Sequence, residues 1–146
     1  AEIVAAAEAL LGPRDLAGLK VLVTAGGTRE PIDPVRFIGN RSSGLMGMEI
    51  ARAAAARGAK VLLVVGPTNL RPPPETEVIR VKTAQEMRDE VFGAASDADA
   101  VIKAAAVADW QADKHADQKL KKADGPPGIF GPLGREPIRR SRIPPH

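Results

Sequence analysis

Aliphatic segments alternate with helical patterns between residues 19 and 106, and this alternation constrains the fold more than any other feature of the chain. The patterns predict strands at residues 19–25, 59–65, 77–81 and 100–106, and helices at residues 43–56 and 84–95. The first two strand segments are continuous β-branched and aliphatic runs, which is typical of strands covered on both faces. This order predicts an α/β fold: a doubly wound, Rossmann-like parallel sheet with right-handed crossovers and helices on both faces.

Both predicted helices carry boundary signals in the sequence. Ser42 or Ser43 can cap the first helix, and Gly58 closes its far end. Thr83 is followed three residues later by Glu86, which is the spacing of a capping box at the start of the second helix.

The chain of 146 residues has about the length of a single domain. We expect a lead-in helix and linker at residues 1–15, one domain at residues 16–122, and a disordered tail rich in Gly, Pro and Arg at residues 123–146, with no strand or helix in it. A first residue other than Met suggests a piece of a longer polypeptide. No run approaches the ~18 apolar residues of a membrane span and the amino end is not basic, so we expect neither membrane insertion nor secretion.

Composition excludes several functional classes. Cysteine is absent, which excludes a disulfide framework, a thiolate metal site and a cysteine nucleophile, and which fits a cytoplasmic protein. His115 and His146 are isolated, so no metal site is predicted from the protein's own ligands. Aromatic residues make up only 3% of the chain, and the tail accounts for most of the net charge of +3, so nucleic-acid binding is not expected and would depend on the tail alone.

Three loops are expected to meet at the carboxyl edge of the sheet, where open parallel sheets bind ligands: residues 26–43, 66–70 and 107–122. The first is long and holds two prolines and five charges between residues 26 and 42, so we expect little regular structure and a functional role. Its glycines and hydroxyl groups, with the helix start that follows, resemble a phosphate cradle: Gly26, Gly27, Gly39, Gly44, Ser42 and Ser43. A glycine-rich turn before a capped helix is the purely structural alternative.

Two further positions suit a nucleotide site. Asp109 follows the fourth strand, where a carboxylate can hold a base, a ribose or a metal-bound phosphate. Lys119, Lys121 and Lys122 form a cationic cluster suited to a leaving polyphosphate, although a solvated surface explains either feature equally simply. The chain has no G-x-G-x-x-G, no Walker lysine and no acidic residue at the end of the second strand, which disfavours NAD.

The segment GGTREPIDPVRFIGNRSSG at residues 26–44, followed by Met46-Gly47, resembles the signature of phosphopantothenoylcysteine synthetase (phosphopantothenate-cysteine ligase). Two further blocks agree with this family: AAAVAD at residues 104–109 and KLKK at residues 119–122. The resemblance covers residues 16–129 and makes residues 16–122 an incomplete ligase domain, because the family continues with further strands whereas residues 130–146 match nothing in it.

The resemblance implies a ligase of coenzyme A biosynthesis that joins 4'-phosphopantothenate to cysteine through a CTP-derived acyl-cytidylate, with Mg²⁺ assisting. It also implies a homodimer of the full-length protein and, in bacteria, a decarboxylase domain with FMN in the same polypeptide. A Rossmann-type NAD(P)-binding oxidoreductase domain and a non-catalytic nucleotide-binding fragment are the alternatives.

The resemblance also assigns roles to single residues. Asn40 would donate its amide to the acyl-cytidylate carbonyl, Arg36 would settle the loop against the anionic intermediate, and Lys119 would meet the triphosphate. The remaining assignments concern the nucleotide: Asp109 with the backbone of Ala105 and Ala106 for the cytidine, and Ser42, Ser43 and Gly44 for a phosphate.

Overall fold

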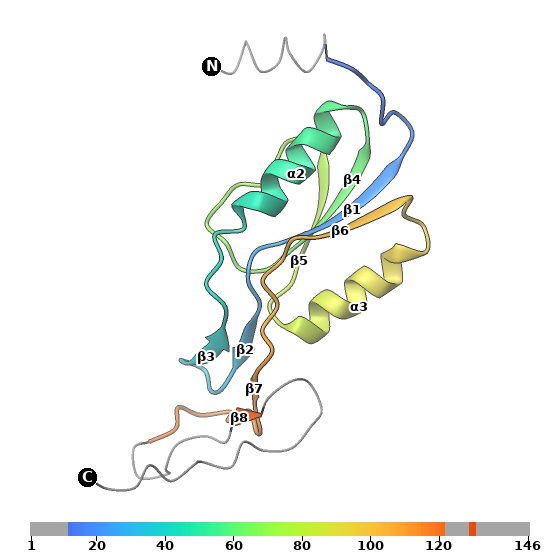
Figure 1. The fold of residues 1–146 in the computed structure, drawn as a ribbon. Coiled ribbons are helices and arrows are strands. Elements are labelled where there is room, and N and C mark those ends of the chain that lie inside the picture. The colour runs from blue at the N-terminus through green and yellow to red at the C-terminus, as the bar shows by residue number, and fades with distance from the viewer. Residues whose placement is uncertain (1–11, 122–128, 131–146) are drawn as a thin grey trace, which may run out of the picture.

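The computed structural model describes residues 12–121 and 129–130. A parallel sheet of four strands forms its centre, in the order β5-β4-β1-β6 (Figure 1). The strands are β1 (Lys20–Ala25), β4 (Lys60–Val65), β5 (Thr76–Arg80) and β6 (Ala100–Lys103). The α/β fold with a parallel sheet is therefore confirmed.

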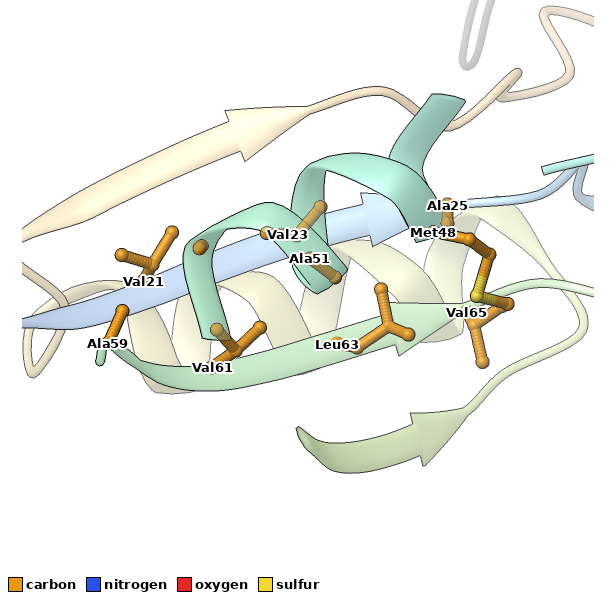
Figure 2. Close-up of a cluster of buried hydrophobic side chains, with 10 residues drawn as sticks. Val21, Val23, Ala25, Met48, Ala51, Ala59, Val61, Leu63 and Val65 are labelled. Atoms are coloured by element: carbon orange, nitrogen blue, oxygen red, sulfur yellow. The ribbon is translucent and has the colours of Figure 1, made fainter. Parts of the chain in front are cut away.

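Helices α2 (Leu45–Ala56) and α3 (Ala84–Ala95) cover opposite faces of this sheet (Figure 1). Each helix packs on one face of the sheet because successive side chains of β1 point to opposite faces. Val21 and Val23 belong to the cluster on the α2 side, which includes Met48 (Figure 2), whereas Leu22 packs with Met87 of α3. Both faces of the central strands are thus buried, as their continuous apolar runs predicted.

The capping box at the start of α3 is confirmed. The Thr83 hydroxyl accepts the backbone N–H of Glu86 at 3.1 Å, and the Glu86 carboxylate accepts the N–H of Thr83 at 3.3 Å. Thr83→Ala should lower the free energy of unfolding by about 1 kcal/mol, because a helix N–H loses its acceptor. Urea unfolding measures this loss. Ser96→Ala, at the exposed end of the same helix, is the control and should change stability by less than about 0.5 kcal/mol.

The first loop contains a regular element that was not expected, although most of residues 26–42 are irregular as predicted. Residues 29–39 contain an antiparallel hairpin of β2 (Arg29–Pro31) and β3 (Phe37–Gly39). Pro31 has no backbone N–H to donate to a neighbouring strand. It is tolerated because β2 and β3 form a separate two-stranded sheet, in which each strand has one edge without a partner strand.

Two strand boundaries also differ from expectation. The strand predicted at 100–106 ends at Lys103. The Ala104 N–H is shared between the Thr24 carbonyl at 3.3 Å and the Thr24 hydroxyl at 3.2 Å, and the Ala105 N–H donates to the same hydroxyl at 3.2 Å. A strand exists beyond residue 122, contrary to prediction: β8 (Ile129–Phe130) pairs antiparallel with β7 (Gln111–Ala112). The predicted lead-in helix and the remainder of the tail lie outside the described residues.

Candidate functional site

The hairpin β2–β3 lies beyond the carboxyl edge of the sheet and is anchored to the start of α3 (Figure 1). Glu30 of β2 is buried, and its Oε1 accepts the N–H of Ala84, the first residue of α3, at 2.8 Å. The N–H of Arg29 donates to the carbonyl of Lys82 at 2.7 Å. A carboxylate at a helix N-terminus is favoured by the helix dipole, so this contact holds the hairpin firmly.

A second set of contacts joins the hairpin base to the segment that follows β6. The Ala106 N–H donates to the Gly26 carbonyl at 2.8 Å, and the Thr28 N–H donates to the Ala106 carbonyl at 3.2 Å. The buried Thr28 hydroxyl accepts the N–H of Ala108 at 2.8 Å. The backbone N–H groups of Ala105 and Ala106, expected at the nucleotide, are therefore engaged with Thr24 and Gly26.

A cleft of about 350 Å³ opens between the hairpin base and the loop after β4. Its lining comprises Gly27, Thr28, Arg29, Phe37, Gly39, Asn40, Arg41, Ser42 and Pro67. The volume lies at the lower end of the ~300–1,000 Å³ typical of ligand pockets. A larger cleft of about 620 Å³ includes Lys20 and Lys60 at the amino ends of β1 and β4, at the opposite edge of the sheet. The carboxyl-edge cleft is the candidate site, since two of the three predicted loops, residues 26–43 and 66–70, line it.

Asn40 lies where the hairpin meets the segment after β6. Its Nδ2 donates to the Val107 carbonyl at 2.8 Å, and the side chain is otherwise exposed at the cleft. An amide nitrogen has two N–H groups, so one donor is left for a ligand after this bond.

The glycines of the predicted phosphate cradle pack against backbone. A Cβ on Gly26 would lie 2.9 Å from the Gly66 carbonyl oxygen, one on Gly27 would lie 2.8 Å from that of Asn40, and one on Gly39 would lie 2.5 Å from that of Thr28. Gly44 has a φ of 81° and is the N-cap of α2, without a side-chain cap, so the prediction that Ser42 or Ser43 caps this helix was wrong. These positions require glycine for close packing of the loops, and phosphate binding by them stays a prediction.

The serines of this loop bind the turn that leads into α2. Ser42 Oγ accepts the N–H of Gly44 at 3.2 Å, and Ser43 Oγ accepts the N–H of Leu45 at 3.3 Å. Both hydroxyl oxygens act here as acceptors, so their hydrogens are left to donate to a ligand. Only Ser42 lines the cleft.

Asp33 holds the hairpin turn beside the predicted Arg36, and sequence reasoning gave it no role. Its carboxylate is buried at the hairpin turn and accepts hydrogen bonds from Arg36 and from the backbone of Leu120. The Arg36 guanidinium, opposed by burial and supported by backbone donors, holds the pKa of Asp33 well below its usual range. Asp33 therefore favours folding above its ordinary pKa, and this contribution is lost only as pH falls below that range. The sequence did carry a local signal for this turn. Asp33 stands two and three residues before Val35 and Arg36, whose backbone N–H groups it accepts.

Arg29, Phe37 and Arg41 were also missed. The Arg29 guanidinium lies 4.6 Å from the centroid of the Phe37 ring, and all three side chains line the cleft. Two exposed arginines give the cleft a cationic wall that suits an anionic ligand. The sequence signal that could have indicated the two arginines is their closeness to the loop glycines: Arg29 follows Gly27, and Arg41 follows Gly39, by two residues.

Of the remaining predicted residues that the structure describes, Arg36, Asp109, Lys119 and Lys121 do not line this cleft. Arg36 and Asn40 flank β3, so their Cα atoms are separated by up to roughly 13 Å along the strand. The backbone beside Lys119 reaches the Arg36 end, whereas the residues after β6 reach the Asn40 end. Asp109, Lys119 and Lys121 are exposed, and Lys122 lies outside the described residues.

Two further properties concern the part of the chain that the structure describes. Within it, no three His, Asp or Glu side chains gather as a metal site. None of its helices has the length and apolar character needed to cross a membrane.

Residues 16–130 match a family model described as the DNA/pantothenate metabolism flavoprotein C-terminal domain. The coenzyme A biosynthesis bifunctional protein CoaBC of Mycobacterium tuberculosis is 56% identical over 119 residues, which is 80% of this chain and 28% of that protein. The chain thus spans about 28% of the length of this curated relative.

Solved structures agree with the family match. The crystal structure of the C-terminal domain of CoaBC shares 44% identity and a TM-score of 0.66 over 73% of this chain and 56% of that one. A Cab2 mutant in complex with phosphopantothenate-cysteine has a TM-score of 0.65 at 17% identity, over 95% of this chain and 61% of that one, which shows a shared fold.

Proposed function

This chain belongs to the DNA/pantothenate metabolism flavoprotein C-terminal domain family, and from this membership we propose that it carries the nucleotide-binding part of a phosphopantothenate-cysteine ligase. In the proposed reaction the carboxylate of 4'-phosphopantothenate attacks the α-phosphate of CTP and pyrophosphate leaves. The amine of cysteine then attacks the acyl carbonyl, CMP leaves, and an amide bond is formed.

The observation that supports this function is a cleft with donors and cations at the carboxyl edge of the sheet. Asn40 presents an amide donor, Ser42 presents a hydroxyl, and Arg29 and Arg41 contribute positive charge. Activation of a carboxylate by a nucleotide needs orientation and stabilisation of charge on phosphate and carbonyl oxygens. The cleft supplies such groups without a cysteine or histidine nucleophile.

In this proposal Asn40 donates to the carbonyl of the acyl-cytidylate at the hairpin base. Lys119 offsets charge on the polyphosphate at the hairpin turn. Asp109 contacts the cytidine nucleotide, and Ser42, Ser43 and Gly44 hold a phosphate at the start of α2.

Magnesium enters this proposal with the nucleotide. Mg²⁺ is commonly held by substrate phosphates, water and only one or two carboxylates. Asp109 is the carboxylate that would join it. The ion would neutralise charge on the departing pyrophosphate.

The wider setting follows from the same membership. We propose cysteine and CTP as co-substrates, a homodimer as the state of the full-length protein, a decarboxylase domain with FMN in the same polypeptide, and a cytoplasmic location. A nucleotide-binding fragment without turnover is the alternative, and a coupled assay of pyrophosphate release separates the two.

Calorimetry with CTP and Mg²⁺ tests the proposal on the 146-residue chain. We expect saturable binding at millimolar nucleotide, with weaker binding of ATP and none of NADH. Arg41→Gln should weaken CTP binding about fivefold, because a cation facing the phosphates is removed. Arg71→Gln removes an equal charge at an exposed position outside the cleft and should change the affinity by less than about twofold. An absence of CTP binding by the unaltered chain would overturn the proposal.

A further inference from the structure

Asp33 and Arg36 together hold the backbone of Leu120, and we call this arrangement the Leu120 clamp. Asp33 Oδ2 accepts the Leu120 N–H at 3.1 Å, and Arg36 Nη2 donates to the Leu120 carbonyl oxygen at 3.1 Å. The same Oδ2 accepts Arg36 Nε at 2.9 Å and Nη2 at 2.5 Å. Both peptide groups that flank the Leu120 Cα are therefore held by one ion pair.

The burial of Asp33 shows that the Leu120 clamp is part of the packed structure rather than a contact between solvent-exposed side chains. Its side chain is 0% exposed, whereas that of Arg36 is 46% exposed. Asp33 Oδ1 also accepts the N–H groups of Val35 and Arg36, at 2.9 and 2.8 Å. Five hydrogen bonds thus converge on one buried carboxylate, which satisfies both of its oxygens.

A further contact attaches the segment that contains Lys119 to the hairpin at a second point. The Ala116 N–H donates to the Ile32 carbonyl at 3.0 Å, four residues before Leu120. The segment 116–120 is therefore held against the hairpin turn at both ends. In this part of the chain the lysine-containing segment has no helix or strand of its own, so these side-chain and backbone bonds define its path.

We propose that Asp33 is a positioning residue of the ligase site, which acts with Arg36 to orient Lys119 toward the polyphosphate of the nucleotide. The proposal rests on the proposed function. The Leu120 N–H belongs to the peptide group that joins Lys119 to Leu120, so the clamp fixes the backbone from which the Lys119 side chain extends. A lysine side chain has high rotamer entropy, and a fixed backbone confines the volume that its ammonium group samples.

The first test compares CTP with CMP, which lacks the two outer phosphates. Asp33→Asn should weaken CTP binding about tenfold in calorimetry with Mg²⁺ and leave CMP binding unchanged. In a Lys119→Ala background, Asp33→Asn should cost no further affinity, because Asp33 acts through Lys119. Asp15→Asn is the control: it breaks another aspartate–arginine pair with two hydrogen bonds, in which Arg57 Nε and Nη2 donate to Asp15 Oδ1 and Oδ2 at 2.8 and 2.5 Å, on a different surface. It should leave both affinities unchanged.

The second test needs no nucleotide. Trypsin cleaves after Lys119, at the peptide bond whose N–H is clamped, so Asp33→Asn should raise cleavage there severalfold while Asp15→Asn should not. Cleavage after Lys60, inside β4, monitors global unfolding in the same digest. In the unaltered protein the Leu120 amide should exchange with solvent more slowly than that of Gln118. If Asp33→Asn fails to fold, this measurement still tests whether the Leu120 clamp holds the backbone in solution.

The outcomes separate the two proposals. A failure of the unaltered chain to bind CTP overturns the proposed function and, with it, the positioning role. Equal losses of CTP and CMP affinity in Asp33→Asn, or no loss of either, overturn the positioning role alone. An unprotected Leu120 amide also overturns it.

Discussion

Gly47→Ala is expected to lower the free energy of unfolding by about 3 kcal/mol, near the upper end of what overpacking of a core costs. Gly47 is buried in α2, at the closest approach of that helix to β1. An added Cβ would lie 2.5 Å from Ala25 Cβ and 2.7 Å from the Thr24 carbonyl oxygen. No rotamer relieves these contacts, because a methyl group has none, so the helix must move away from the sheet.

Gly93→Ala supplies the matched control. Gly93 lies within α3, a helix of 12 residues like α2, and an added Cβ there meets nothing within 4 Å. Alanine is favoured over glycine in a helix by up to about 1 kcal/mol, so this variant should be neutral or more stable. Thermal unfolding should place Gly47→Ala roughly 10 °C below the unaltered protein. Equal melting temperatures for the two variants would contradict the packing explanation.

The displacement of α2 in Gly47→Ala should also alter the candidate site. Gly44, Ser42 and Ser43 precede α2 directly, and the Thr68 hydroxyl donates to the Ser43 carbonyl at 2.6 Å. A helix displaced from β1 moves this junction and the cleft wall formed by Ser42. Nucleotide affinity should therefore fall in Gly47→Ala but not in Gly93→Ala.

The main sheet and its helices were predictable because each is a long segment with its own pattern. β1 and β4 are uninterrupted aliphatic runs, and α3 begins with a capping box in the sequence. Such signals are local, so they can be recognised without knowledge of distant partners. Even so, the end of β6 was misplaced, since it depends on the Thr24 hydroxyl, 80 residues away from Ala104.

The hairpin β2–β3 was not predictable for the opposite reason. Its strands have three residues each, and they contain Pro31 and charged side chains rather than an alternating pattern. Contacts from outside hold it: Ala84 is 54 residues from Glu30, and Leu120 is 87 residues from Asp33. A local sequence pattern cannot report such partners, so the resemblance identified the loop while the geometry of Asp33 became visible only in the structure.

Asn40→Ala is expected to stop cysteine coupling in a chain extended to the full length of its relatives, while CTP binding is preserved. Removal of one donor to a developing oxyanion typically costs ~10²–10³-fold in rate, and Asn40 is proposed to serve the acyl carbonyl rather than the nucleotide. Its Nδ2 already donates to the Val107 carbonyl at 2.8 Å, which fixes the direction of the amide before the ligand arrives. Such preorganisation makes the remaining N–H effective as a donor.

Three measurements on Asn40→Ala separate this role from a structural one. Calorimetry should give a CTP affinity within about threefold of the unaltered protein, because the nucleotide contacts are intact. Pyrophosphate should still be released once per site, and the acyl-cytidylate should accumulate in mass spectra, because the step that needs the amide comes later. Asn69→Ala removes an exposed amide from the loop after β4 and should leave coupling unchanged. Equal losses of CTP binding and coupling in Asn40→Ala would show that the side chain supports the cleft rather than the acyl carbonyl.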